Sequence, residues 1–392
     1  MNNVLQKYAS AYRNKITNKL FGVVSLHTNE KKKGAMLLSF ITGPFTLAPG
    51  EFYTDPHSNY WVAIEIARLF TGRGYDVDVI NWNDTHFIPK KKYNACIDMQ
   101  YNLKRLSPYL WPDCIKIMHI VASYPPFQNE AEQKRLDALK ERRGRTVSPH
   151  RTDPATSDPS VADFIEGYGN KTVRGTYPNV GKDIIPIPIP TMNIYDFPEK
   201  KDFAAAREHF LWFGGGGAIL KGLDLVVEVF AELPHLQLSI IGPSAYEKEF
   251  EEIYAKELQL PNITRYGRPH INERGEHMVG NRDIREVYDQ CGSIIFLSAS
   301  EGGGGATVQS MQAGLFPIVT PNTGIDESAP SIVVKDLSIE NIKKVVEDFS
   351  NLPPEQVGKL ARGSWAFARE HHTKEAFTKA YEDFLDNVVK LP

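Results

Sequence analysis

Two clusters of glycine, each close to a side chain that can bind a charged or hydroxylated ligand, are the most informative feature of the sequence. In the first, FLWFGGGGAILKGLDLVVEVF, the glycines Gly214, Gly215, Gly216 and Gly217 precede Lys221. Glycines leave no Cβ atoms in the way of a ligand, so backbone N–H groups can approach it, and the lysine adds positive charge at the next helix start. This arrangement fits a diphosphate. A flexible turn with a surface lysine is the alternative, since neither the dinucleotide nor the Walker spacing is met.

The second cluster is FLSASEGGGGATVQSMQAGLFPIVTPNTGIDE, in which Glu301 follows a predicted strand. Ligands of open α/β sheets bind at the carboxyl ends of strands, and the helix that follows favours negative charge at its N-terminus. Gln309 lies about two helical turns after Glu301. One carboxylate and one amide so placed can bind two hydroxyl-bearing rings, whereas Glu301 alone could be a helix-capping acid. The glycines between them are Gly302, Gly303, Gly304 and Gly305.

Alternating strand and helix patterns surround both clusters. The run AMLLSFIT at 35–42 is short and continuously apolar, a helical pattern follows it, and strand character returns at 76–82. Strand, helix and strand within one short stretch predict the parallel crossover unit of a doubly wound sheet. The same alternation restarts at HFLWFGG and continues to FPIVT, which predicts a second unit of the same kind.

A proline-rich segment separates the two units. The stretch DIIPIPIPTMNIYDFPEKKDF cannot sustain a helix or a central strand, so it is the best linker in the chain. We predict an N-terminal Rossmann-like acceptor domain at 1–195, with a helical extension at its start, and a C-terminal Rossmann-like donor domain at 196–375. A last helix at 376–392 is expected to pack back toward the N-terminal domain. The two α/β domains are expected to face each other across a cleft.

Composition narrows the classes of partner. A net charge of -3 argues against nucleic acid, whose binding requires dense clusters of Lys and Arg. The three cysteines, Cys96, Cys114 and Cys291, are far apart and odd in number, which fits neither a disulfide framework nor a zinc site and favours a reducing compartment. No run of about 18 apolar residues marks a membrane span. We therefore predict a cytoplasmic protein.

The N-terminal segment MNNVLQKYASAYRNKITNKLFG combines an apolar helical stripe with basic residues, among them Lys7, Arg13, Lys15 and Lys19. A helix packed on its own domain, with a solvated basic face, is the favoured interpretation. Peripheral contact with anionic lipid at the membrane surface is the alternative.

The glycine clusters resemble the donor-site motifs of the retaining glycosyltransferases of family four, group 1 glycosyltransferases with the GT-B fold. The resemblance is strong over 207–370 and weaker over 35–195. The matching residues lie in both clusters: Phe213, Gly214, Gly215, Lys221, Gly222, Ser298 to Glu301, Gly302, Gly304, Met311, Gly314 and Pro317.

The resemblance implies a role for each residue. Lys221 would neutralise the diphosphate of a nucleotide-sugar donor, Glu301 would contact the transferred sugar, and Gln309 would bind the ribose. His119, in IKIMHIVA, occupies the place of a histidine that approaches the reacting sugar; a hydrogen-bonded histidine at a strand end fits the sequence equally well. The implied co-substrate is a UDP- or GDP-linked sugar, with no further cofactor and no metal.

Two positions depart from the family pattern. The family usually has an arginine five residues before the lysine, and here that position is Gly216. The missing guanidinium removes one diphosphate partner, for which Arg268 or Arg282 could substitute. Gln309 stands where the family has a second glutamate, and its amide can still exchange hydrogen bonds with a ribose diol.

Asp76-Val77-Asp78 has the Asp-x-Asp form that metal-dependent transferases of another fold use. It lies inside a predicted strand, so we interpret it as structural.

The favoured function is sugar transfer with retention to a glycan, lipid or small-molecule acceptor, in polysaccharide or glycoconjugate biosynthesis. A catalytically impaired sugar-nucleotide-binding protein is the alternative, because Gly216 and Gln309 depart from the pattern. A third hypothesis is a different enzyme of the same architecture, such as an epimerase or a phosphorylase. The presence of both the Gly-Lys and the Glu-Gly motif argues against it.

Overall fold

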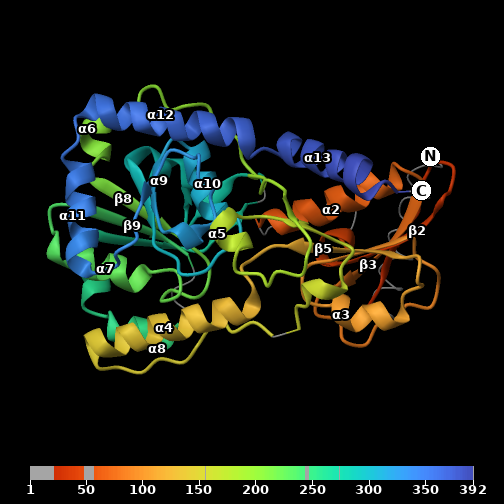
Figure 1. Cartoon of the computed structure of the whole chain (residues 1–392). Helices are drawn as coiled ribbons and strands as arrows, with labels where there is room; N and C mark the ends of the chain where they lie inside the picture. Colours follow the sequence, from red (N-terminus) through yellow and green to blue (C-terminus); the bar gives the residue numbers. More distant parts are fainter. Residues whose placement is uncertain (1–21, 48–56, 155, 243–246, 273, 392) are drawn as a thin grey trace.

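The computed structural model describes residues 22–47, 57–154, 156–242, 247–272 and 274–391. Two α/β domains, each built around a mainly parallel sheet, lie side by side along the length of the molecule (Figure 1). The basic N-terminal segment, predicted to pack on its own domain or to contact lipid, lies outside the described residues. Within the described part of the chain, no helix is both long enough and apolar enough to cross a bilayer.

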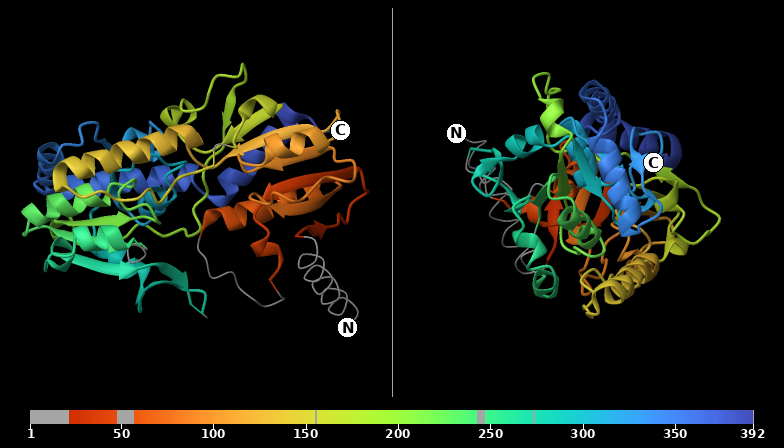
Figure 2. Two further views of the ribbon diagram at one scale, coloured as in Figure 1. Left: turned by 90° about the horizontal axis from the view of Figure 1, so that it is seen from below. Right: turned by 90° about the vertical axis from the view of Figure 1, so that its left-hand side faces the viewer.

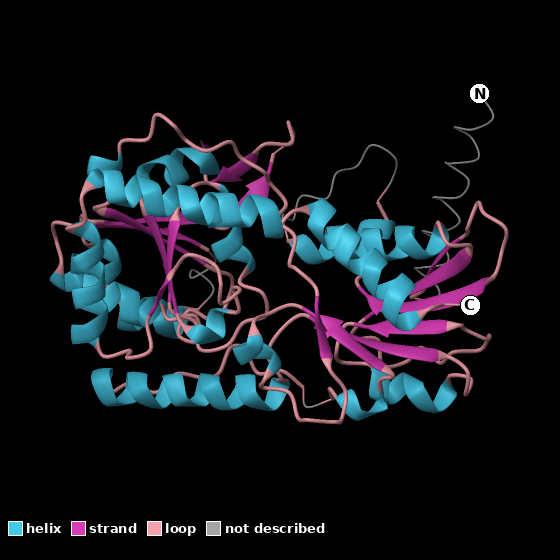
Figure 3. Cartoon of the chain, turned by 45° about the horizontal axis from the view of Figure 1, so that its top comes forward, coloured by secondary structure: helices cyan, strands magenta, loops and turns pink. Residues whose placement is uncertain are grey.

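In the described residues, the N-terminal sheet has seven strands in the order β1-β3-β2-β4-β5-β6-β7, parallel except at the β1 edge. The central strand β2 is buried from Ala35 to Phe40 because strands flank it and helices cover both faces of the sheet, which explains its apolar run (Figure 3). The strands are β1 (Val24–Leu26), β2 (Gly34–Phe40), β3 (Tyr75–Asn81), β4 (Ala95–Asp98), β5 (Ile115–Ile120), β6 (Phe164–Gly167) and β7 (Ile184–Pro186). The helices of this domain are η1 (Gly43–Phe45), α2 (Ser58–Thr71), α3 (Leu103–Leu106), η2 (Ser107–Tyr109), η3 (Pro159–Val161) and α5 (Lys171–Arg174).

The C-terminal sheet is parallel throughout, in the order β10-β9-β8-β14-β15-β16. Its strand order reverses between β8 and β14, and in open α/β sheets this switch point is where ligands bind, outside the carboxyl ends of the strands. The strands are β8 (His209–Phe213), β9 (Gln237–Ile241), β10 (Ile263–Gly267), β14 (Ser293–Phe296), β15 (Phe316–Val319) and β16 (Ile332–Val333).

Helices surround this second sheet, and a small antiparallel sheet interrupts the alternation after β10. The sequence patterns did not predict that sheet, whose strands are only two or three residues long. Its strands are β11 (Pro269–Ile271), β12 (His277–Val279) and β13 (Arg282–Asp283). The helices are α6 (Phe203–Ala206), α7 (Leu223–Glu232), α8 (Lys248–Ile253), η5 (Glu257–Gln259), α9 (Ile284–Gln290), α10 (Gly305–Gln312), η6 (Pro321–Thr323), α11 (Ile339–Ser350) and α12 (Pro354–His371).

Helix α4 (Pro125–Arg143) follows β5 of the N-terminal sheet but packs against the C-terminal domain, beside α8 (Figure 1, Figure 2). Arg142 pairs with the buried carboxylate of Asp224 in α7, at 2.5 Å. The buried guanidinium of Arg135 donates to the backbone oxygen of Leu297. Helix α4 thus belongs to the N-terminal half of the sequence but is attached to the C-terminal domain, while the division near residue 195 stays a prediction.

The chain crosses back at its end. Helix α13 (Lys374–Asp383) and the π-helical turn η7 (Phe384–Val389) lie on the N-terminal domain. Thr378 donates to Glu65 of α2 at 2.6 Å, and the hydroxyl of Tyr381 donates to Glu166 of β6 at 3.3 Å.

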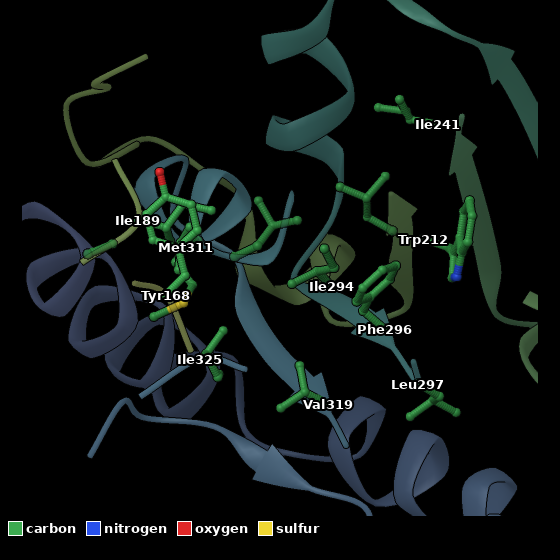
Figure 4. Close-up of a cluster of buried hydrophobic side chains, with 14 of the residues drawn as sticks. Tyr168, Ile189, Trp212, Ile241, Ile294, Phe296, Leu297, Met311, Val319 and Ile325 are labelled. Atoms are coloured by element: carbon green, nitrogen blue, oxygen red, sulfur yellow. The ribbon is translucent and has the colours of Figure 1, made fainter. Parts of the chain in front are cut away.

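A shared apolar cluster packs the two domains together. Figure 4 shows Tyr168 and Ile189, which come from the N-terminal side of the chain, beside Met311 and Ile325 of the C-terminal domain. All four side chains are buried. The edge of the C-terminal sheet that carries both glycine clusters therefore adjoins the N-terminal domain.

Candidate active site

The two glycine clusters leave neighbouring strands of the C-terminal sheet. Strands β8 and β14 pair in parallel, Ser293 with Phe210 and Ile294 with Leu211. Lys221 follows β8 and Glu301 follows β14, so both reach the same sheet edge, on the two sides of the switch point. This is the place where the fold binds ligands.

Two glycines of the first cluster are required by packing or backbone conformation, and the other two have room for a side chain. A Cβ on Gly214 would lie 2.6 Å from the ring of Trp212, and Gly217 has a φ of +90°, which favours glycine. A Cβ on Gly215 would meet no atom within 4 Å, and one on Gly216 would meet only Glu247, at 3.9 Å. Gly215 and Gly216 are therefore the members of this cluster beside open space.

Lys221 and Glu301 form an ion pair, with the ammonium group against Oε1 of the carboxylate. Both side chains are largely buried, at 9% and 18% exposure. Burial lowers the pKa of Lys221, and the charge of Glu301 acts in the opposite direction. The alternative of a solvated surface lysine does not hold, because the side chain is enclosed between its loop and the ring of Phe296, 5.6 Å away.

The N-terminal domain holds the backbone of Glu301 in place. Ser123 donates its backbone N–H and its hydroxyl to the Glu301 carbonyl oxygen, at 3.1 and 2.8 Å. The hydroxyl of Ser298 lies 3.3 Å from the Glu301 carboxylate. The orientation of the carboxylate thus depends on both domains.

Glycines of the second cluster allow close contact between the domains. A Cβ on Gly302 would lie 2.0 Å from the carbonyl oxygen of Val121, and one on Gly303 would lie 3.0 Å from Ile189. Gly304 has a φ of +64° and caps α10, which begins at Gly305. The resemblance implies that these glycines belong to the donor site, which stays a prediction; the structure adds a packing role for Gly302 and Gly303.

Glu247 is a member of the site that the sequence analysis did not identify. Its buried carboxylate accepts the N–H of Gly217 at 2.7 Å and that of Ala218 at 3.0 Å. It lies 30 residues from Gly217 and belongs to no recognisable motif. The backbone amides of the first cluster thus bind an anionic group, and that group is a side chain of the protein.

The side-chain amide of Gln309 is engaged by the linker. Its Oε1 accepts the backbone N–H groups of Met192 and Asn193, both at 3.2 Å, and its Nε2 donates to the Asn193 carbonyl at 3.0 Å. In this arrangement the amide attaches the linker to α10. The ribose role that the resemblance gives to Gln309 stays a prediction.

His119 lies inside the N-terminal domain. Its Nδ1 is 2.8 Å from a Glu166 carboxylate oxygen, and both side chains are fully buried. The rings of Phe40 and Tyr168 flank it, at centroid distances of 5.4 and 5.0 Å. These contacts are those of a hydrogen-bonded histidine at a strand end, and the side chain is 0% exposed in this structure. Its predicted approach to the sugar stays untested.

The structure also locates the other candidates. Asp76 pairs with Lys32 at 2.6 Å, and Asp78 pairs with Lys91 at 2.8 Å, in keeping with a structural role for the Asp-x-Asp form. Arg268 and Arg282, the candidate substitute cations, are both exposed on the segment that builds the small antiparallel sheet. Arg268 directly follows β10, and Arg282 lies in β13.

Comparison with known proteins supports the family resemblance. Residues 199–357 match the family model for glycosyl transferases group 1, which confirms the resemblance over most of the C-terminal domain. No curated protein matches the sequence.

Solved structures share the architecture. A glycosyltransferase from Rickettsia africae is 13% identical over 93% of this chain and 100% of its own, with a TM-score of 0.57. Trehalose-6-phosphate synthase is 9% identical over 91% and 99%, with a TM-score of 0.55. TarM is 10% identical over 75% of this chain, with a TM-score of 0.50, and the chain spans 54% of its length. At these identities the likeness concerns the fold alone, and it confirms the expected GT-B architecture of two Rossmann-like domains.

Proposed function

We propose that the protein is a glycosyltransferase that moves a sugar from a nucleotide-sugar donor to an acceptor, with retention of the anomeric configuration. The observation that carries this proposal is the meeting of Lys221 and Glu301 at the switch point of the C-terminal sheet. The first provides a cation for a diphosphate, and the second a carboxylate for sugar hydroxyls. The match to group 1 glycosyl transferases supports the same assignment.

The proposed chemistry relies on fixed charges. As the bond between sugar and diphosphate breaks, negative charge grows on the leaving phosphate, and the Lys221 ammonium stabilises it. Because Lys221 is buried, its charge acts in a low-dielectric environment and is stronger than it would be in water. The first-turn N–H groups of α10, which begins at Gly305, face the same end of the sheet and favour an anion. This route requires no metal.

We assign the donor to the UDP- or GDP-linked sugars and leave the acceptor as a glycan, a lipid or a small molecule. Retention is proposed from the family resemblance of the two glycine clusters. The acceptor would bind on the N-terminal domain, where Ser123 contacts the Glu301 loop.

A product assay tests the proposal. The full chain is incubated with UDP-, GDP- and ADP-sugars, with and without candidate acceptors, and released nucleoside diphosphate is measured by chromatography. Release that depends on one base and increases with an acceptor supports the proposal; the anomeric configuration of the product, read by NMR, tests retention. No release from any donor, with every acceptor tried, counts against sugar transfer.

A second candidate is a sugar-nucleotide-binding protein without turnover. Two observations favour it: Gly216 lacks the family's arginine, and the Gln309 amide is engaged by the linker backbone. Saturable binding of a sugar nucleotide without any release of nucleoside diphosphate would identify this case.

A further inference from the structure

An arginine from the other half of the sequence lies on the first glycine cluster. Arg151 belongs to the connection between α4 and β6, yet its side chain packs on Gly217. A Cβ on Gly217 would lie 2.4 Å from Cγ of Arg151 and 3.2 Å from its Cδ. Glycine at position 217 is therefore what lets this side chain lie along the loop.

The backbone of Arg151 is fixed by two buried side chains of α4. Its N–H donates to the Glu132 carboxylate at 2.9 Å, and its carbonyl oxygen accepts from the Gln128 amide at 2.9 Å. Glu132 and Gln128 are 3% and 2% exposed. Because α4 is itself attached to α7, Arg151 belongs structurally to the donor domain although the sequence places it in the other one.

The charge of Arg151 acts on the same site as Lys221. Burial is the main cause of the lowered pKa of Lys221, and the positive charge of Arg151 lowers that pKa further. Within the described residues, no salt bridge joins the Arg151 guanidinium to a carboxylate, and the side chain is exposed. The nearby acids are otherwise engaged, since Glu301 pairs with Lys221 and Glu247 accepts the loop amides. Two like charges held at one loop repel each other unless an anion lies between them.

We propose that Arg151 is the second cation of the diphosphate site and supplies the guanidinium that the family places at the position of Gly216. This inference rests on the proposed function and refines it. The cation comes from the α4–β6 connection, its stem lies on Gly217, and its head is free to make paired hydrogen bonds to phosphate oxygens, as guanidinium groups do. Gly216 then needs no side chain, and the departure from the family pattern does not imply loss of activity.

Isothermal titration of the full chain with UDP and GDP tests the inference. For the nucleotide that the wild type binds, Arg151→Ala is expected to weaken the diphosphate by about tenfold or more, and to leave the matching nucleoside monophosphate less affected. The matched control is Arg145→Ala, which removes an exposed arginine of the same connection, 3.9 Å from Glu252, and should not change either affinity.

A rescue variant excludes an indirect effect. Gly216→Arg, added to Arg151→Ala, restores a guanidinium at the family's own position, where there is room for a side chain. Recovery of diphosphate affinity supports the inference. Unchanged affinity in Arg151→Ala, with the wild type binding normally, overturns it while the proposed function stands. A folded wild type that binds neither nucleotide nor any of their sugars overturns the proposed function and this inference together.

Discussion

The ammonium group of Lys221 contacts the carboxylate of Glu301, although the two residues lie 80 positions apart in the sequence. Each comes from a loop at the carboxyl end of a neighbouring parallel strand, so the sheet itself brings them together. A diphosphate that binds Lys221 would share with Glu301 the three N–H donors of one ammonium group. Under the proposed function, donor binding and the position of the Glu301 carboxylate are thus coupled.

Replacing Lys221 by methionine should keep the packing and remove the charge. We expect turnover to fall by roughly 10² to 10³, the scale for removing one stabiliser of developing negative charge. The measurement is steady-state release of nucleoside diphosphate, with the thermal unfolding midpoint as the check on folding. Lys359→Met, at an exposed position of α12, is the control. A folded Lys221→Met variant with wild-type turnover would contradict the assignment of Lys221 to the diphosphate.

Glu301→Gln should weaken the binding of the sugar without weakening the binding of the nucleoside diphosphate. The neutral amide releases Lys221 from its ion pair, so bare nucleoside diphosphate should bind at least as tightly as it does to the wild type. Transfer should fall, because the substitution removes the carboxylate that we propose binds the sugar. Titration with the diphosphate and with its sugar, alongside turnover, checks this. Equal losses of affinity for both ligands would contradict the assignment.

Gln309→Glu tests whether the side chain serves the linker or the ribose. A carboxylate still accepts from Met192 and Asn193 but cannot donate to the Asn193 carbonyl. We expect the free energy of unfolding to fall by about 1 kcal/mol, the scale of one hydrogen bond, with donor affinity little changed. Urea unfolding and titration measure the two effects, and Gln356→Glu, exposed in α12, is the control. A large change in donor affinity at constant stability would instead place residue 309 at the ribose.

His372 should make the protein less stable in acid. Burial lowers its pKa to about 4, below its ordinary value of 6.5. Between these values the unfolded chain binds a proton that the folded chain does not, so stability falls as pH drops from 6.5 to 4 and levels off below. The loss attributable to this group is up to roughly 3 kcal/mol.

His372→Gln keeps a donor for the Ile189 carbonyl and removes the titration, so its stability should depend less on pH over this range. Urea unfolding at several pH values measures this, and the exposed neighbour variant His371→Gln should behave like the wild type. The same pH dependence in both variants would refute the role of His372.

The sequence predicted those site residues that can be identified from their immediate neighbours in the chain. An apolar strand followed by glycine and then a lysine or glutamate marks the carboxyl end of a parallel strand, and both Lys221 and Glu301 were identified in this way. The pairing of β8 with β14 then follows from the doubly wound order.

Contacts between distant segments could not be predicted. Glu247 and Arg151 reach the glycine loop from other parts of the chain and carry no motif. The attachment of α4 to the C-terminal domain is such a contact, because the ion pair of Arg142 with Asp224 joins residues 82 positions apart. The contact of Gln309 with the linker was not predicted either, because the N–H groups of Met192 and Asn193 belong to an irregular segment without a sequence pattern; the ribose role of Gln309 stays a prediction.

Donor affinity is the quantity that tests the account most directly. Isothermal titration of the wild type with UDP-glucose, GDP-mannose and ADP-glucose should show saturable binding for one nucleotide base, and the affinity should fall in Lys221→Met and in Arg151→Ala but not in Lys359→Met. If the folded wild type binds none of the three, or if all variants bind as tightly as the wild type, the site formed by Lys221 and Glu301 does not bind a nucleotide sugar.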